Sequence, residues 1–154
     1  MQKVVVFTGA GMSAPSGIST FRDADGLWEK HSIEEVATPQ GWHKDQDKVL
    51  DFYNARRAQL AEVEPNDGHY AIASLEEQYE VVVVTQNVDN LHERAGSTNI
   101  LHLHGELTKV RSVKNPADIF DIGTNPIKTG DYCDEGGQLR PHIVWFGEQP
   151  QFLD

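Results

Sequence analysis

The sequence predicts an α/β fold in which a parallel β-sheet carries helices on both faces. Two β-branched runs, residues 3–8 and 81–85, lack the alternation of apolar and polar residues and are typical of strands buried inside a parallel sheet. A helical pattern follows each run. Because strands that alternate with helices form sheets with right-handed crossovers, we expect both runs in one parallel sheet.

The remaining elements follow from apolar spacing and from residues that start or stop helices. A helix is expected over 47–63, and Asn66 is placed to cap a second helix that runs through residue 79. A short helix over 88–95 would end at Gly96. The runs 100–103 and 143–146 complete the predicted strands.

Composition divides the chain into a core and a polar insertion. Residues 1–107 and 139–154 are predicted to form the core, and the stretch 108–138, which is polar and contains Gly and Pro, is predicted to be a small irregular inserted subdomain. At 154 residues the chain is long enough for one domain with a real core.

Charge and cysteine content restrict the partners. A formal net charge of −11 argues against nucleic acid and against anionic membrane surfaces, because phosphate groups are bound by clustered Lys and Arg. The single cysteine, Cys133, excludes an internal disulfide. No stretch approaches the roughly 20 apolar residues of a membrane span, so we expect no membrane association and, by default, a cytoplasmic location.

The turn after the first strand is rich in small residues. Gly9 would permit a tight turn, Gly11 would let backbone N–H groups approach a ligand, and Ala14 would let the following helix pack close to the strand. A buried strand, such a turn and a helix start are together the arrangement that holds a dinucleotide pyrophosphate. Glycine-rich turns after strands are also common as purely structural features.

Polar clusters follow three predicted strands at the point where each strand ends. The segment 9–11 follows the first strand, 86–89 the second, and His104 the third. Because ligands of parallel α/β sheets bind beyond the carboxyl ends of the strands, the three clusters predict one shared site.

Several motifs in this order resemble the sirtuins, which are NAD-dependent protein-lysine deacylases. The spacing matches the family over nearly the whole chain, and a Tyr-x-x-Arg pair within 53–56 is similar to the class III, prokaryotic-type members. The motifs are Gly9-Ala10-Gly11-Met12-Ser13, Gly17-Ile18-Ser19-Thr20-Phe21-Arg22, Thr85-Gln86-Asn87-Val88-Asp89, His102-Leu103-His104-Gly105 and Val144-Trp145-Phe146-Gly147-Glu148.

The resemblance implies a Rossmann-like core that binds NAD and transfers an acyl group from a protein lysine to ADP-ribose, with release of nicotinamide. His104 would be the catalytic base, since imidazole accepts protons near neutral pH, and Asn87 would act beside it. On a strand, His102 would point to the same side as His104. The implied cofactor-binding residues are Gly9, Ala10, Gly11, Ser13, Gly17, Ile18, Phe21, Arg22, Trp28, Gln86, Asn87, Val88 and Asp89.

Some of these residues have a simpler structural interpretation. Asn87 or Asp89 could cap a helix, and Phe21 could be an ordinary core residue. Asn87 and Asp89 together would supply the donor and the acceptor that a carboxamide needs.

Substrate contacts are expected at two places. Tyr53 and Arg56 share a helix face, and a guanidinium with a phenol would bind acidic acyl groups such as succinyl, malonyl or glutaryl. The alternative is that Arg56 is one of two adjacent arginines on a solvated face. The segment Val144, Trp145, Phe146 and Gly147 would be the strand edge that receives the substrate backbone, or else Trp145 and Phe146 are core residues.

The chain departs from the family in two respects. Most sirtuins carry two Cys-x-x-Cys pairs that bind zinc, but here only Cys133 is present, so we predict no zinc and expect hydrogen bonds and packing in its place. Sirtuin domains also usually exceed 200 residues, so we expect the C-terminal part of the sheet to be missing and apolar surface to be uncovered.

Other functions remain possible on these residues alone. An NAD- or ADP-ribose-binding module without turnover is the main alternative. A nicotinamide-dependent oxidoreductase is disfavoured, because the acidic ribose-binding residue expected about 20 residues after the glycines is replaced by a loop and helix. Mono-ADP-ribosyl transfer shares the first chemical step and is poorly separated by sequence.

Overall fold

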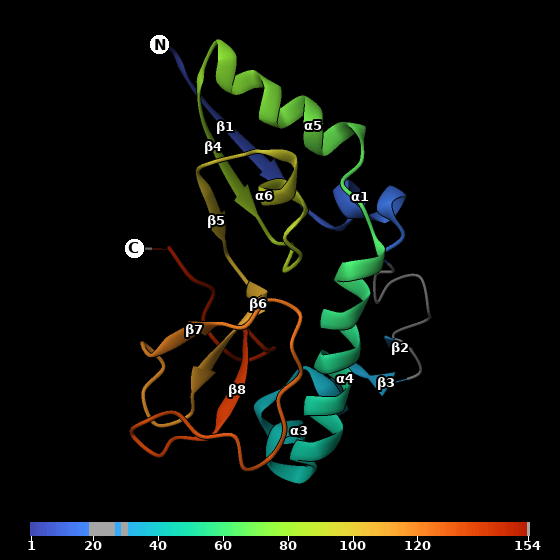
Figure 1. Ribbon diagram of the computed structural model, residues 1–154, viewed down its shortest axis with the longest axis vertical. Helices are drawn as coiled ribbons and strands as arrows, with labels where there is room; N and C mark the ends of the chain where they lie inside the picture. The colour runs from blue at the N-terminus through green and yellow to red at the C-terminus, as the bar shows by residue number, and fades with distance from the viewer. Residues whose placement is uncertain (19–26, 29–30, 154) are drawn as a thin grey trace.

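The computed structural model describes residues 1–18, 27–28 and 31–153, and Figure 1 shows two lobes, each built around a small sheet. Helix α4 (Gln46–Gln59) runs alongside the lower lobe. None of the helices in the described part of the chain is both long and apolar enough to cross a bilayer. The shorter elements between β1 and α4 are α1 (Ala10–Ser13), η1 (Ala14–Ser16), β2 (Leu27–Trp28), β3 (His31–Ser32), α2 (Ile33–Val36) and α3 (Pro39–Lys44).

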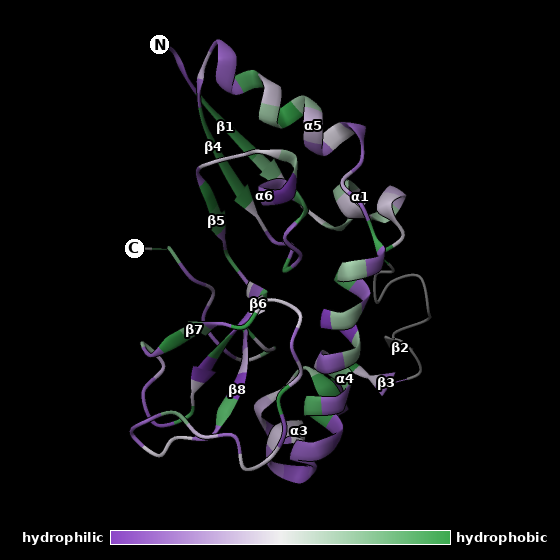
Figure 2. Ribbon diagram, in the orientation of Figure 1, coloured by the Kyte–Doolittle hydropathy of each residue, from purple (hydrophilic) through white to green (hydrophobic). Residues whose placement is uncertain are grey.

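The upper lobe contains the predicted parallel sheet. Strands β1 (Lys3–Thr8), β4 (Glu80–Thr85) and β5 (Ile100–His102) pair in the order β1-β4-β5, all parallel. The register pairs Thr8 with Thr85 and Thr85 with His102, so the three strands end at one level. The valine runs therefore do form neighbouring strands, and Figure 2 shows β1 and β4 as hydrophobic ribbons side by side.

Cover on the two faces of this sheet is unequal. Val81 and Val83 are buried and pack with Ile72 of α5 (Asp67–Ser74). On β1, however, Val5 and Phe7 are 62% and 61% exposed. The sequence predicts helices on both faces, whereas Val5 and Phe7 of β1 form an open apolar face in this structure.

The predicted helices are present with shifted ends. α4 gives way at Leu60 to a 3-10 turn, η3 (Leu60–Glu62), and α5 likewise passes into η4 (Leu75–Glu77). Asn66 caps α5 as predicted, and His69 completes a capping box with it. Helix α6 (Leu91–Ala95) starts three residues later than expected, because Asp89 Oδ1 accepts the N–H of Leu91, and it ends at Gly96 with φ of 110°.

The lower lobe corrects two sequence predictions. Residues 108–138 are predicted to be irregular, but β6 (Gly105–Ser112) and β7 (Ile119–Asp121) pair there as antiparallel strands. The last strand, β8 (Leu139–Ile143), pairs antiparallel with β6 and ends where the predicted strand 143–146 begins. β6 crosses the limit drawn at 107, whereas β8 begins at the limit drawn at 139. The division into two domains stays a prediction.

The tip of the lower lobe holds the positions where zinc cysteines are missing. A hydrogen bond with Ser112 lowers the pKa of the Cys133 thiol. Ser112 Oγ also accepts the backbone N–H of Lys114 at 3.1 Å, and a Cβ on Gly137 would lie 2.0 Å from this oxygen. Hydrogen bonds and close packing therefore hold this turn, and the absence of zinc stays a prediction.

Arg57 of α4 joins the helix to the lower sheet. Its side chain is fully buried, its Nε donates to Leu107 O at 2.8 Å, and its Nη1 donates to Asn54 Oδ1 at 2.8 Å. Asn54 in turn bonds both the N–H and the C=O of Ile127. Burial lowers the pKa of Arg57 to about 10. Arg57 thus ties α4 to β6 and, through Asn54, to the loop at Ile127.

Replacing Arg57 by Ala is expected to lower the free energy of unfolding by about 2–4 kcal/mol, because it removes charge-assisted hydrogen bonds and leaves Leu107 O buried without its donor. The matched variant Arg56→Ala, at the adjacent half-buried position, is expected to change it by only about 0.5 kcal/mol. Urea denaturation of both variants measures the difference. Equal losses would contradict the structural role given to Arg57.

Candidate active site

A cavity of about 480 Å³ lies at the carboxyl ends of the three parallel strands. Residues that follow β1, β4 and β5 all line it, which confirms that the three polar clusters converge. The predicted site residues among those that line the cavity are Ala10, Ser13, Ile18, Tyr53, Arg56, Gln86, Asn87, Val88, Asp89, His104, Val144, Trp145, Phe146 and Gly147.

A few predicted residues are placed elsewhere. Gly9, Gly11 and Gly17 do not line the cavity. Phe21 and Arg22 lie outside the described residues, and of Trp28 only the backbone, in β2, is described. Sequence reasoning missed several lining residues, most of them apolar side chains whose types carry no chemical signal: Ile33, Ala37, Gln59, Leu60, Leu107, Ile143, Glu148 and Pro150.

The glycine turn after β1 differs from its predicted role in one respect. Gly9 has φ of −140°, an extended conformation that any residue adopts, so the turn does not require glycine there. Its carbonyl instead accepts hydrogen bonds from Met12 N and from Asn87 Nδ2. A Cβ on Gly11 would meet no described heavy atom within 4 Å, so this position is open to a ligand.

Ser13, Asn87 and Asp89 form one hydrogen-bonded group. Ser13 Oγ donates to Asp89 Oδ2 at 2.7 Å, and Asn87 Nδ2 donates to Gly9 O at 2.9 Å and to Ser13 Oγ at 3.3 Å. All three polar side chains are at least nine-tenths buried. Asp89 Oδ1 accepts the N–H of Leu91, as the capping interpretation expects, but the N-cap residue of α6 is Asn90, and Asn87 links the loop to the turn after β1.

A second group of buried side chains fixes the strand ends beneath this site. Thr8 Oγ1 donates to Thr85 Oγ1 at 2.7 Å and lies 3.0 Å from His92 Nε2. Because the only hydroxyl hydrogen of Thr8 goes to Thr85, His92 Nε2 is the donor. Thr85 Oγ1 also accepts the N–H of Asn87. The loop 86–89 is therefore anchored to both strands.

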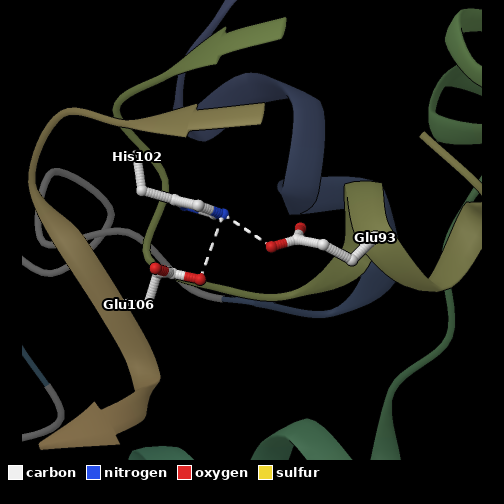
Figure 3. Close-up of side chains that lie close together, drawn as sticks. All are labelled: Glu93, His102 and Glu106. Atoms are coloured by element: carbon white, nitrogen blue, oxygen red, sulfur yellow. Dashed lines mark hydrogen bonds and ion pairs between the residues drawn. The ribbon is translucent and has the colours of Figure 1, made fainter. Parts of the chain in front are cut away.

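His102 faces away from the cavity, at the base of the same loop. Figure 3 shows its ring pointing to Glu93 and Glu106. Its Nε2 lies 2.7 Å from Glu93 Oε2 and 3.8 Å from Glu106 Oε1, and its Nδ1 lies 2.8 Å from Asn87 O. The ligand-type atoms of these three side chains lie within 4.8 Å of one another.

His104 lines the cavity, so the expectation that His102 and His104 point to one side is wrong. The strand ends at His102, and Leu103 and His104 form a turn that reverses the alternation. Leu103 N donates to Thr85 O, and His104 O accepts from Val144 N at 2.8 Å. The catalytic candidate is thus held by hydrogen bonds from both lobes.

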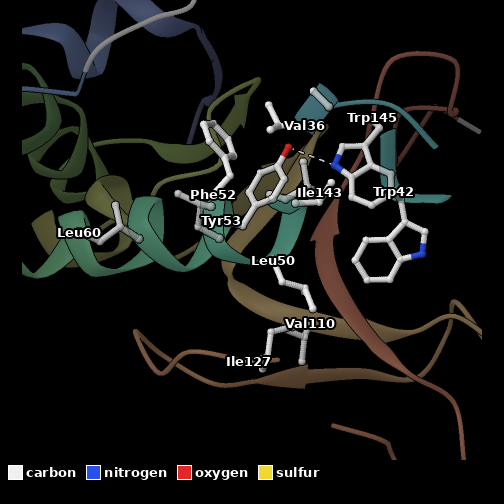
Figure 4. Close-up of a cluster of buried hydrophobic side chains, with 13 residues drawn as sticks. Val36, Trp42, Leu50, Phe52, Tyr53, Leu60, Val110, Ile127, Ile143 and Trp145 are labelled. Atoms are coloured by element: carbon white, nitrogen blue, oxygen red, sulfur yellow. Dashed lines mark hydrogen bonds between the residues drawn. The ribbon is translucent and has the colours of Figure 1, made fainter. Parts of the chain in front are cut away.

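Aromatic residues of α4 and of the segment after β8 form the far wall of the cavity. Figure 4 shows Tyr53 of α4 pointing to Trp145, whose Nε1 donates to the Tyr53 hydroxyl at 3.1 Å. Burial raises the pKa of Tyr53 well above its usual range, so the phenol stays protonated. Arg56 lines the same cavity, with its guanidinium carbon 5.4 Å from the Phe52 ring centre. Tyr53 and Arg56 therefore do face one cavity.

The segment 144–147 is not the strand predicted for it. Val144 N donates to His104 O, Phe146 N to Ala37 O at 2.9 Å, and Trp145 N to Glu148 Oε1 at 2.8 Å. Trp145 is a core residue, 2% exposed, whereas Phe146 is 56% exposed at the cavity rim. The N–H groups are thus used within the protein, because the chain turns here to close the cavity.

Arg140 and Glu148 hold this turn in place. Arg140 donates to both oxygens of Glu148, at 2.9 and 3.1 Å, and to Ile143 O at 2.7 Å. Its guanidinium carbon lies 3.6 Å from the Trp145 ring centre. Burial raises the pKa of Glu148, but the hydrogen bonds from Arg140 and Trp145 N and the charges of Arg140 and Arg111 together outweigh it, so the net pKa is lowered.

Comparison with known proteins points to one family. A family model described as the Sir2 family matches residues 9–153. A curated relative from Bacteroides thetaiotaomicron, named NAD-dependent protein deacylase, is 60% identical over 153 residues, a match that covers 96% of this chain and 65% of the relative. The chain thus spans just under two thirds of the length of that relative.

Solved structures agree in fold. A Sir2 homologue mutant in complex with ADP-ribose matches with a TM-score of 0.85 at 43% identity, over 97% of this chain and 61% of that chain. A Sir2 homologue in complex with NAD matches with a TM-score of 0.83 at 44% identity, over 97% of this chain and 59% of that chain. The parallel sheet and its helices therefore follow a known Rossmann-like architecture.

Gly105→Ala is expected to lower the free energy of unfolding by about 2 kcal/mol or more, because Gly105 has φ of +91° and a Cβ would lie 2.0 Å from His142 O. Gly11→Ala, where a Cβ meets open space, is expected to change it by less than about 1 kcal/mol. Thermal unfolding measures both. A Gly105 variant as stable as the Gly11 variant would contradict the tight contact between β6 and β8.

Proposed function

Because the chain belongs to the Sir2 family, we propose that it acts as an NAD-dependent protein-lysine deacylase. The observation that carries the proposal is that one cavity joins the polar strand ends, with Ser13, Asn87, Asp89 and His104, to a wall with Arg56. The first group suits a dinucleotide and the second an acyl chain. Acylated lysine side chains of proteins are the proposed partners. A cytoplasmic location stays a prediction.

The residues at the strand ends fit the nicotinamide side of NAD. Both hydrogens of Asn87 Nδ2 are donated within the protein. A ligand can therefore form a hydrogen bond with this side chain only by donating to its Oδ1. Asp89 adds a carboxylate. Such an acceptor-rich floor suits a ligand with a positive ring, a carboxamide N–H and ribose hydroxyls. Gly11 leaves room for the phosphates.

The chemistry divides between the cofactor and the chain. When bound, NAD supplies an ADP-ribosyl group whose bond to nicotinamide is weakened by the positive charge of the ring. We assign His104 the role of accepting a proton from a hydroxyl, since it lines the cavity on a turn held from both lobes. Asn87 and Asp89 orient the ligand, and the buried bonds of Ser13 keep both in place.

The far wall supports acidic acyl groups as substrates. Arg56 carries N–H groups of the type that bind carboxylates, and Tyr53, whose hydroxyl burial keeps protonated, lies in the same wall. Both residues line the cavity that His104 also lines. We therefore propose that succinyl-, malonyl- or glutaryl-lysine is preferred, with the peptide near Phe146 and Gly147 at the rim.

His104→Ala is expected to reduce deacylation by about 100-fold or more, because a positioned general base contributes that much to proton transfer. The measurement is mass-spectrometric turnover of matched acetyl- and succinyl-lysine peptides with NAD, with O-acyl-ADP-ribose as the product followed. Turnover that survives in the variant would contradict the role of His104. NAD binding without turnover by the folded chain would instead support a binding module.

Arg56→Met is expected to reduce kcat/KM for the succinyl peptide by about 10- to 100-fold, because it removes a charge-assisted hydrogen bond to the carboxylate while an unbranched side chain still fills part of the space. The acetyl peptide serves as the internal control, and its kcat/KM should change by less than about threefold. An equal loss on both peptides would contradict acyl recognition by Arg56.

A further inference from the structure

The His102 ring is enclosed by hydrogen-bond acceptors. It is 4% exposed, with Nδ1 2.8 Å from Asn87 O and Nε2 2.7 Å from Glu93 Oε2 (Figure 3). A carbonyl and a carboxylate can only accept hydrogen bonds, and a neutral imidazole has a single N–H. With Glu93 ionised, both contacts are hydrogen bonds at the same time only when both ring nitrogens carry hydrogen. The pair is then an imidazolium and a carboxylate.

The charges around the ring agree with this state. Burial lowers the pKa of His102, but the hydrogen bonds with Glu93 and with the Asn87 carbonyl and the charges of Glu93 and Glu106 together outweigh it, so the net pKa is raised. Burial raises the pKa of Glu93, but the hydrogen bond and charge of His102, a backbone hydrogen bond and the charge of His92 together outweigh it, so the net pKa is lowered. From β6, Glu106 faces Nε2 at 3.8 Å and is itself paired with Lys109 at 2.9 Å. His92 is the other titratable group near Glu93.

A metal ion fits the Glu93, His102 and Glu106 group less well than a proton does. A tetrahedral zinc about 2.0–2.1 Å from each ligand would hold nitrogen and oxygen roughly 3.3 Å apart. The observed separation of Nε2 and Glu93 Oε2 is 2.7 Å, the length of a charge-assisted hydrogen bond. Glu106 is also occupied by Lys109.

We propose that His102 is a positioning residue, an imidazolium held by Glu93 that donates Nδ1–H to the Asn87 carbonyl and thereby fixes the loop 87–89 relative to His104. This inference rests on the proposed function for the role of that loop. The protonation state of His102 and its bond to Asn87 can be tested without it.

The position of the ring explains how it would act. Asn87 N is bound by Thr85 Oγ1 and Val88 O by Leu107 N, so the His102 bond to Asn87 O completes the anchoring of this loop. His102 itself ends β5, two residues before His104. Loss of the ring contact would release the loop from the strand that carries the catalytic candidate.

The protonation state is tested by nitrogen-detected NMR of the histidine rings in the chain and in Glu93→Gln, with Glu77→Gln as a matched control at an exposed glutamate. The expected result is a His102 with both ring nitrogens protonated at pH 6 and a pKa above 6.5, which falls in Glu93→Gln and not in Glu77→Gln. A neutral His102 at pH 6, or an unchanged pKa in Glu93→Gln, would overturn the proposal.

The pH dependence of stability gives a second readout of the same pair. The contribution of His102, whose folded pKa is raised, is complete below pH 6.5 and is lost as pH rises through the folded value. The contribution of Glu93, whose folded pKa is lowered, is complete above pH 4.5 and is lost as pH falls through the folded value. The stability difference between the native chain and Glu93→Gln should therefore be largest between pH 4.5 and 6.5. A difference independent of pH would count against the ion pair.

Positioning is tested with His102→Leu, which has no donor, and His102→Asn, whose amide can replace Nδ1–H. We expect the Asn87 carbonyl carbon resonance to move in His102→Leu and to return toward the native value in His102→Asn. NAD affinity should fall about tenfold or more in His102→Leu and be partly restored in His102→Asn. If His102→Leu is unfolded, a pH titration of the native chain tests the positioning role instead. The proposal predicts that the Asn87 carbonyl carbon resonance moves with the titration of His102.

The outcomes separate the two proposals. A native chain that binds no NAD would contradict the proposed function, while the ring state and the Asn87 resonance would still decide the role of His102. A folded His102→Leu with native Asn87 resonances would overturn the positioning role, whatever the activity.

Discussion

The site depends on the hydrogen bond between the buried hydroxyls of Thr8 and Thr85, which joins the ends of β1 and β4. This bond fixes the two strands in register at the level where the chain leaves the sheet. The Thr85 hydroxyl accepts the backbone N–H of Asn87. In the turn after β1, the Gly9 carbonyl and the Ser13 hydroxyl accept hydrogen bonds from the side-chain amide of Asn87. Unpaired, each of these buried groups would cost about 1–3 kcal/mol, so the network specifies one arrangement of the loop.

The lower lobe depends on α4, in which neighbouring residues make different contacts. Tyr53 and Arg56 line the cavity, while Arg57 enters the core and binds β6. Trp145 connects the same helix to the turn after β8 through the Tyr53 hydroxyl. The residues behind this wall of the cavity are buried and hydrogen-bonded, which fixes the position of the wall. In the role proposed for it, His102 holds the loop 87–89 through a hydrogen bond in the same way.

Much of this arrangement follows from local sequence, and the rest does not. The valine runs specify the parallel strands, Asn66 and Gly96 mark helix ends, and polar residues after each strand identify the site, since these signals act within a few residues. The burial of Arg57 and the antiparallel pairing of β8 with β6 depend on contacts far apart in the chain. The prediction that His102 and His104 point to one side is wrong for a related reason: side chains alternate only while the strand continues, and β5 ends at His102.

The most direct test of this account is to map NAD binding on the chain by NMR. The account predicts that backbone amides of Gly11, Asn87 and His104 shift together and saturate at one affinity, while amides near Cys133, at the tip of the lower lobe, do not move. Saturable shifts confined to other surfaces, or no shift in a folded chain, would contradict a dinucleotide site built from the three strand ends.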